Sequence, residues 1–307
     1  MSRSLDILAV QAAPLLIGTP FAVFAEQARA ALADHPGADL LMFPELHLFH
    51  AEGDSLDIRN AALRAAAAVL TPQLADPLDA ALSALARDLG VCLIPGTLCE
   101  AGPQGELFNT ARVYGADGAV LASYRKIFPW RPSEPYDPGD SFVVFDLPGK
   151  GRLGLTICYD AWFPEVSRQV AWMGAEVILN LVKTTTADRA QELVLARANA
   201  IVNQTFLLSL NCAGPVGMGQ SLLVDPEGWV QAACDQAEPG VIRARLDLAE
   251  VAAIRQRGTC GENRLWHPFR PGDRPIALPT YGGFIDPAHW APPGFGEQRS
   301  DTESPMA

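Results

Sequence analysis

The sequence predicts an α/β protein in which two mixed β-sheets face each other and helices cover their outer sides. Short apolar runs rich in Val, Ile and Leu alternate with helical patterns along most of the chain, as is typical of sheets with helices packed on them. The pair Asp117-Gly118 lies between two such runs, and Asp-Gly is a strong signal for a hairpin turn. Part of the sheet structure is therefore expected to be antiparallel, which disfavours a simple doubly wound fold.

The N-terminal segment begins with an apolar run at residues 6–11, which we interpret as a strand. Thr19-Pro20 supplies a cap and a first turn, so a helix is expected over residues 20–34. The next apolar run, residues 39–43, ends abruptly at Pro44-Glu45, which places a glutamate at the end of a strand. Residues that line a site often occupy such positions.

Ala-rich segments follow from about residue 56 to residue 89 and predict helices, which Gly90 brings to an end. Residues 91–97 are apolar and predict a buried strand. The two arms of the predicted hairpin cover residues 108–114 and 120–126. Lys126, the last residue of the second arm, is therefore expected at a strand end.

The second half of the chain continues the same alternation. Helices are expected over residues 164–172, which Gly174 closes, over residues 188–204, and from about residue 248. Between and around them we expect strands at residues 142–147, 152–158, 177–180, 206–211, 221–224, 230–234 and 241–246.

One domain is expected over residues 1–270, because no Ser/Gly-rich linker, charge block or low-complexity tract interrupts it. The remainder, residues 271–307, is rich in Pro and Gly and carries scattered aromatic residues. We predict that this extension has little regular structure, that it lies across a neighbouring subunit, and that residues 297–307 are disordered.

Composition limits the functional classes. The 307-residue chain is 49% hydrophobic and 19% charged, as a globular protein should be, and its formal net charge of -12 argues against binding to nucleic acid or an anionic membrane. No interior stretch reaches membrane-spanning length and the N-terminus lacks the features of a secretory signal, so we expect a cytoplasmic protein. The cysteines and histidines show no zinc-ligand spacing, and no nucleotide or flavin motif is found, so we expect no cofactor.

The segment around Cys158 carries the first chemical signal. The sequence Gly-Leu-Thr-Ile-Cys158-Tyr159 brings an apolar strand to a sharp turn before a helix, which resembles a nucleophile elbow. In such a turn the backbone N–H of Tyr159 can point at a developing oxyanion. A buried structural cysteine is the simpler alternative if this segment is taken alone.

A thiol with a pKa near ~8.5 needs a base or a neighbouring cation to react at neutral pH. No histidine lies in a comparable strand-end motif, so the candidate base is Glu45, whose pKa would rise through desolvation at the end of its strand. Lys126 could favour the thiolate and hold oxyanion charge. Taken singly, both residues are more often solvated surface charges.

Together, Phe-Pro-Glu45, Tyr-Arg-Lys126 and Ile-Cys158-Tyr-Asp, in this order and each at a strand end, resemble the nitrilase superfamily of carbon-nitrogen hydrolases. The resemblance covers about residues 5–257. It implies a four-layer α-β-β-α sandwich, a Glu-Lys-Cys catalytic set, and a homo-oligomer of at least a dimer in which sandwiches stack.

Further motifs bear on the substrate. Residues 132–140 resemble the segment that carries an additional family glutamate, which makes Glu134 the candidate to position Lys126 and the substrate amine or attacking water. The stretch that ends in Trp130 resembles aliphatic amidases and formamidases, and Trp130 is a candidate pocket residue. Many relatives have an arginine where this chain has Trp162, and the segment around Lys183 follows no subfamily pattern. Trp162 and Lys183 are candidate pocket residues because these positions usually line the pocket. Since they depart from the family pattern, the identity of the substrate stays open.

The function we expect is hydrolysis of a non-peptide carbon–nitrogen bond, foremost that of a small amide, through a thioester on Cys158. Nitrile hydrolysis and N-carbamoyl hydrolysis use the same catalytic set and stay open. A binding or scaffold protein with the same fold is the alternative of another class, although all three catalytic positions are filled.

Overall fold

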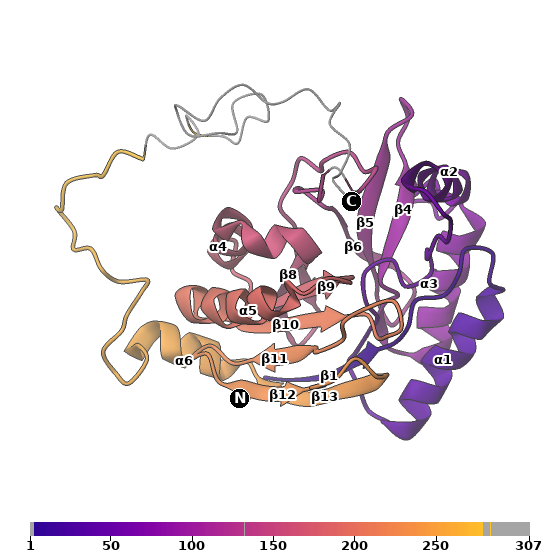
Figure 1. Ribbon diagram of the computed structural model, residues 1–307. Coiled ribbons are helices and arrows are strands. Elements are labelled where there is room, and N and C mark those ends of the chain that lie inside the picture. The colour runs from indigo at the N-terminus through magenta and orange to yellow at the C-terminus, as the bar shows by residue number, and fades with distance from the viewer. Residues whose placement is uncertain (1–2, 132, 279–282, 284–307) are drawn as a thin grey trace. The chain divides into compact units, whose positions relative to one another are not determined.

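The computed structural model describes residues 3–131, 133–278 and 283 (Figure 1). The chain divides into a main unit, residues 1–266, and a C-terminal segment, residues 267–307. The predicted disorder of residues 297–307 concerns a segment outside the described residues.

The first sheet has seven strands and is mixed. Its central strands β1, β2 and β3 are parallel to one another, whereas β13, β5, β4 and β6 pair antiparallel with their neighbours. In spatial order the strands are β13 (Gly240–Asp247), β1 (Ser4–Gln11), β2 (Leu40–Met42), β3 (Cys92–Ile94), β5 (Leu107–Tyr114) and β4 (Thr97–Ala101), and β6 (Val120–Arg125) also pairs with β5. The hairpin predicted at Asp117-Gly118 is confirmed, since it joins β5 to β6.

The second sheet has six strands and is also mixed, with β8, β9 and β10 parallel and the outer pairs antiparallel. The spatial order is β12 (Val230–Ala233), β11 (Leu222–Val224), β10 (Phe206–Asn211), β9 (Val177–Val182), β8 (Gly151–Ile157) and β7 (Val144–Leu147). Helices α4 (Pro164–Trp172) and α5 (Arg189–Asn203) follow β8 and β9 in the chain, and α6 (Ala249–Arg257) follows β13.

Three hydrophobic clusters show how the layers stack. One joins the facing sides of the two sheets, for example Ile7 of β1 with Leu155 of β8. Another joins the other side of the first sheet, through Leu8 and Leu41, to α1 (Phe21–Asp34) and α3 (Pro77–Leu89). The third joins the second sheet to α4 and α5. Neighbouring residues of one strand thus belong to different clusters, because successive side chains point to opposite faces of the sheet.

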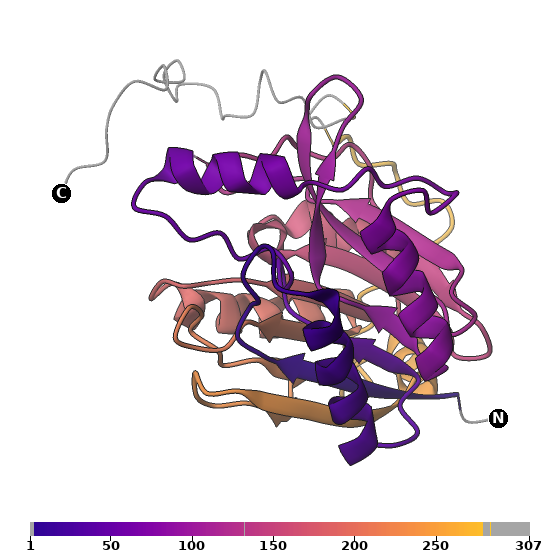
Figure 2. The same ribbon diagram turned by 90° about the vertical axis from the view of Figure 1, so that its right-hand side faces the viewer.

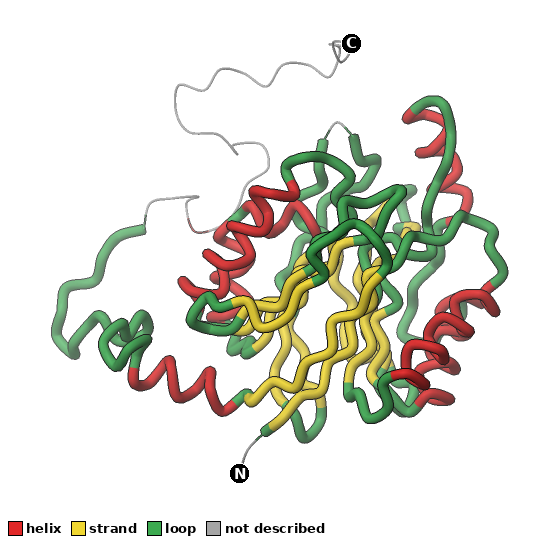
Figure 3. The backbone as a smooth tube through the Cα atoms, turned by 60° about the horizontal axis from the view of Figure 1, so that its bottom comes forward, coloured by secondary structure: helices red, strands yellow, loops and turns green. Residues whose placement is uncertain are grey.

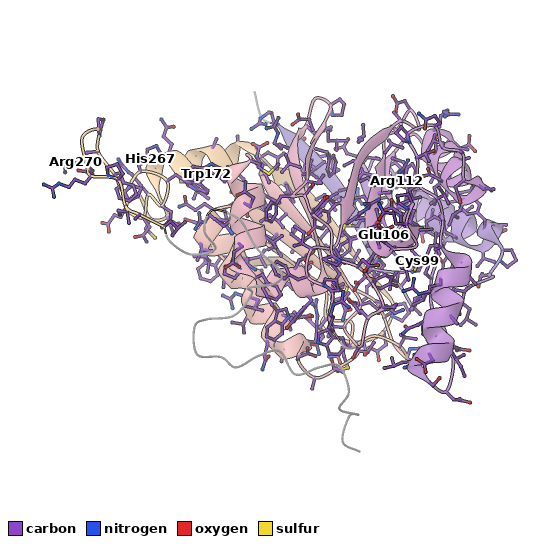
Figure 4. The ribbon with its side chains drawn as sticks, turned by 90° about the horizontal axis from the view of Figure 1, so that it is seen from above. Cys99, Glu106, Arg112, Trp172, His267 and Arg270 are labelled. Atoms are coloured by element: carbon purple, nitrogen blue, oxygen red, sulfur yellow. The ribbon has the colours of Figure 1, made fainter. Side chains whose placement is uncertain are left out.

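These clusters define the predicted four-layer α-β-β-α sandwich. Figure 2 shows α1 and α3 in front of the first sheet, and Figure 3 shows the strands between helices on both sides. In Figure 4, Cys99 and Arg112 lie in the half that carries β4 and β5, and Trp172 lies in the half that carries α4. No helix in the described part of the chain is long and apolar enough to cross a bilayer.

Some predicted boundaries are wrong. The expected strand over residues 91–97 is two strands, β3 and β4, which both pair with β5 and are separated by Pro95-Gly96. Gly96 has φ 97° and lies so close to the carbonyl oxygen of Pro44 that any Cβ would collide with it. Local apolar character does not reveal such a turn, because a distant segment requires it.

The helices predicted between residues 56 and 89 are α2 (Leu56–Ala66) and α3. The Ser55 side chain accepts a hydrogen bond from Ile58 N at the start of α2. Asp76 does the same from Leu78 N for α3, and Pro77 opens that helix. At α1 the structure shows no side-chain cap, so the expected Thr19 cap is wrong.

Candidate active site

Cys158 follows β8 directly and begins a short 3-10 helix, Cys158–Trp162, rather than ending the strand as predicted. Its φ of 47° is in the left-handed region that a residue with a side chain rarely adopts. The residue as a whole remains partly exposed. A strained turn that presents a thiol after a buried strand is the geometry of a nucleophile elbow.

Asp160 holds this turn against the strand end that carries Lys126. Its carboxylate is fully buried and accepts hydrogen bonds from Ile157 N at 2.9 Å, Tyr124 Oη at 2.7 Å and Phe128 N at 2.9 Å. Burial raises the pKa of Asp160 to about 6, although these bonds oppose the rise. Since Tyr124 and Phe128 flank Lys126 and Ile157 precedes Cys158, one side chain fixes the two segments relative to each other.

Glu45, Lys126 and Glu134 form a charged cluster that is almost entirely removed from water. Lys126 Nζ lies 3.2 Å from Glu45 Oε1 and 2.8 Å from both carboxylate oxygens of Glu134. The Lys126 side chain is 0% exposed, that of Glu45 1%, and that of Glu134 16%. An ammonium buried this deeply stays charged only because two carboxylates compensate for its lost hydration.

The partners of this cluster come from several elements. Asn109 of β5 donates its Nδ2 hydrogen to Glu45 Oε1 at 2.7 Å, and the backbone N–H of Lys126 donates to Asn109 O at 2.9 Å. Glu134 Oε2 also accepts from the backbone N–H of Trp130 at 2.8 Å. Both carboxylates are therefore fixed by donors other than the ammonium that they share.

Electrostatics couple the cluster to the thiol. Burial raises the pKa of Glu45, and Lys126 offsets only part of the rise. Burial also raises the pKa of Cys158 well above its usual range, with Glu45 adding to the rise and Lys126 opposing it. The pKa of Lys126 lies well above its ordinary value, because Glu134 and Glu45 outweigh the effect of burial. Such a thiol is neutral at rest, beside a carboxylate that can accept its proton.

A second buried network also reaches Cys158. Its Sγ is 3.8 Å from Thr184 Oγ1, and that hydroxyl lies 2.7 and 2.8 Å from the two carboxylate oxygens of Glu192. Arg189, almost fully buried, donates to Glu192 Oε2 at 3.0 Å. Sequence reasoning missed these residues and Asn109, because their roles depend on contacts between elements that no local pattern records.

The predicted pocket residues have different positions. Tyr159 and Trp162 are partly exposed and lie in the 3-10 helix that begins at Cys158, with their ring centroids 6.0 Å apart. Trp130 is 39% exposed and meets the cluster through its backbone, so a pocket role of its indole stays a prediction. Lys183 follows β9, immediately before Thr184. The described residues include no group of three or more His, Cys, Asp or Glu side chains that could hold a metal ion.

Comparison with known proteins assigns the family. The family model Carbon-nitrogen hydrolase matches residues 9–256, most of the chain. A formamidase of Pseudomonas syringae pv. tomato is 30% identical over 244 residues, which are 74% of this chain and 68% of that protein.

Two solved structures are similar as well. Nit3 of Saccharomyces cerevisiae, a member of branch 10 of the nitrilase superfamily, aligns with a TM-score of 0.72 at 26% identity, over 83% of this chain and 94% of that chain. A variant of an amidase from Nesterenkonia sp. AN1 aligns with a TM-score of 0.62 at 26% identity, over 83% and 95%. In that structure the acetamide moiety of fluoroacetamide is covalently added to the active-site cysteine. The present chain therefore belongs to the carbon-nitrogen hydrolase family of the nitrilase superfamily and is an enzyme of the amidase type.

Proposed function

We propose that the protein hydrolyses a small amide through a thioester on Cys158. The observation that carries this proposal is the buried Lys126 ammonium, held 3.2 Å from Glu45 and 2.8 Å from Glu134, in electrostatic contact with a partly exposed thiol on a strained turn. A buried cation beside a nucleophile can stabilise charge that develops on a carbonyl oxygen. The two carboxylates can accept and return protons.

The chemical steps follow from these positions. The Cys158 thiol gives its proton to Glu45 as its sulfur attacks the amide carbon, and the carbonyl oxygen becomes an oxyanion beside Lys126 and the Tyr159 N–H. Glu45 then returns the proton to the amine nitrogen, the carbon–nitrogen bond breaks, and a thioester remains. Water that Glu45 deprotonates, with Glu134 nearby, attacks the thioester. Carboxylic acid leaves and the thiol regains its proton.

An amide is favoured over a nitrile or an N-carbamoyl compound by the relatives. The similar protein from Pseudomonas syringae pv. tomato is named a formamidase, and the Nesterenkonia enzyme is named an amidase. The same catalytic set could also hydrolyse nitriles through a thioimidate, so the reaction class needs a direct assay. A scaffold without turnover would need no buried Lys-Glu cluster beside a thiol.

We also propose a cytoplasmic homo-oligomer of at least two subunits. Several apolar side chains are exposed on α5 and near β12, and exposed apolar surface of this kind marks association sites. They are Val194 at 67%, Ile201 at 43%, Val202 at 41%, Trp229 at 67% and Val230 at 46% exposure. Light scattering after size exclusion should give a mass of at least two chains, and a monomer at micromolar concentration would refute this assembly.

The test of the reaction is release of ammonia or amine from short aliphatic amides, aryl amides, nitriles and N-carbamoyl amino acids. Cys158→Ala is the control for background release. Release from amides alone, lost in this variant, is the expected result. Release confined to nitriles or carbamoyl compounds would reassign the reaction, and no release together with no acyl adduct on the protein would support a scaffold.

A further inference from the structure

Lysine is rare in this protein, and its lysines differ in whether they are paired with a carboxylate. The chain contains Lys126, Lys150 and Lys183, whereas its other cationic side chains are arginines. Lys150 forms a surface ion pair with Asp39 at 2.7 Å, and Lys126 is paired with Glu45 and Glu134. In the described part of the chain, no carboxylate lies within ion-pair distance of Lys183.

Lys183 follows the strand that neighbours the one leading to Cys158. Strand β9 runs parallel to β8 with Leu181 opposite Ile157, so both strands end together, and Lys183 immediately precedes Thr184. Thr184 Oγ1 is 3.8 Å from Cys158 Sγ, and Thr184 N donates to Asn211 Oδ1 at 2.9 Å. The backbone at Lys183 is therefore fixed beside the nucleophile.

The ammonium of Lys183 has little to bind. It can donate three hydrogen bonds, but its only described contact is with His50 Nδ1 at 3.5 Å, which is long for a hydrogen bond. Burial lowers the pKa of Lys183, while Cys212 and Glu45 among nearby acidic groups offset part of that effect. Cys99 of β4, from the other half of the sandwich (Figure 4), also acts on this charge.

Lys183 is partly exposed, so a cation without a paired anion is open here to an anionic ligand that reaches the site. A surface lysine could reach solvent, and a purely structural position would favour an apolar side chain. Lys183 instead lies at the strand end that also carries Thr184, the residue whose hydroxyl contacts the thiol. Its missing partner is therefore expected to arrive with the substrate.

We propose that Lys183 binds an anionic group of the substrate, so that the preferred substrates are amides that also carry a carboxylate. This inference rests on the proposed amide hydrolysis at Cys158. The carboxylate can belong to the acyl part or to the amine part of the amide. Lys183 then determines specificity, and it takes no part in bond breaking.

The experiment compares substrates that differ only in charge. Succinamate and butyramide have the same acyl chain, with a carboxylate replacing a methyl group, and N-acetylglycine carries its carboxylate on the amine side. The uncharged counterparts are butyramide for succinamate and N-ethylacetamide for N-acetylglycine. For one of these two pairs, the wild-type kcat/KM of the carboxylate amide should exceed that of its counterpart by about 10- to 100-fold, which is the effect expected from the loss of a charge pair in the site.

Lys183→Met removes the charge and keeps the length of the side chain. This variant should lose the preference through a higher KM for the carboxylate amide, and Lys183→Arg should restore part of it. The ratio of the two substrates within one variant does not depend on the fraction of folded enzyme. Lys150→Met is the matched control, and its ratio should equal that of the wild type.

A binding assay separates failure of this inference from failure of the proposed reaction. In the Cys158→Ala variant, calorimetry should show that succinamate or N-acetylglycine binds more tightly than its uncharged counterpart. Adding Lys183→Met to this variant should abolish the difference in affinity. Cys158-dependent turnover with equal preference in wild type and Lys183→Met would overturn the role of Lys183 alone. If no amide is turned over, equal affinity for the charged and uncharged compounds would also overturn the role of Lys183.

Discussion

Glu134→Gln removes one negative charge from the buried cluster and nearly preserves its shape. Both oxygens of Glu134 lie 2.8 Å from Lys126 Nζ, whereas Glu45 offers one oxygen at 3.2 Å. Glutamine keeps one acceptor and loses the charge. A hydrogen bond between charged groups contributes about 1.5–3 kcal/mol, and the 16% exposure of Glu134 moderates the loss.

We therefore expect Glu134→Gln to lose about 2–3 kcal/mol of transition-state stabilisation, because Lys126 is less firmly held where the oxyanion forms. At about 1.36 kcal/mol for each tenfold change, this is a fall of about 30- to 150-fold in kcat/KM. The assay is initial-rate ammonia release from an amide that the wild type hydrolyses. Asp140→Asn removes a charge from an exposed position in the same loop and should keep kcat/KM within about twofold, in line with typical surface effects.

The pH profile tests the reasoning more sharply. Glu134 raises the pKa of Glu45 and also that of Lys126. Without its charge both pKa values fall. Glu45 must lose its proton to act as base and Lys126 must keep its proton, so both limbs of the kcat/KM profile should move to lower pH. A loss below about threefold, or limbs that do not move, would show that Glu134 only packs the loop.

Three further changes have defined outcomes. Asp160→Asn puts an amide nitrogen against buried N–H and O–H donors, so it should lower the free energy of unfolding by about 2–4 kcal/mol and also lower kcat. The control Asp146→Asn changes an exposed residue and should leave the melting temperature nearly unchanged. Equal melting temperatures for the two variants would contradict the role of Asp160. Glu192→Gln should speed alkylation of Cys158 by iodoacetamide by about two- to tenfold, because the Glu192 charge raises the pKa of Cys158 and its loss favours the reactive thiolate. An unchanged rate constant would show that this network does not act on the thiol. The acid limb of wild-type kcat/KM should lie above the ordinary glutamate pKa of about 4.3, because burial raises the pKa of Glu45, and a limb at or below that value would exclude Glu45 as the base.

The site residues that could be predicted from the sequence are those at strand ends. Glu45, Lys126 and Cys158 each follow an apolar run, and the strands that precede them are β2, β6 and β8. The alternation of strands and helices likewise predicted two mixed sheets with outer helices. The fold prediction is confirmed because its signal is contained within a few neighbouring residues, and the same kind of signal predicts where Glu45, Lys126 and Cys158 lie, whereas their catalytic roles stay predictions.

The remainder depends on contacts between distant segments. The break in the expected strand over residues 91–97 exists because Gly96 must pass close to Pro44. Asn109 lies inside a fully buried strand, where nothing local marks it as a partner of Glu45. Glu192 is one acidic residue on a helix, and only the packing of α5 brings it to Thr184.

The central claim is that turnover passes through an acyl group on Cys158. The most direct measurement is mass spectrometry of protein that is acid-quenched during turnover of an amide, followed by peptide mapping. We expect a mass increase equal to the acyl group on the peptide that contains Cys158, sensitive to hydroxylamine and absent from Cys158→Ala, which should release no ammonia. Full ammonia release by Cys158→Ala, or an acyl group on another residue, would contradict the proposed mechanism.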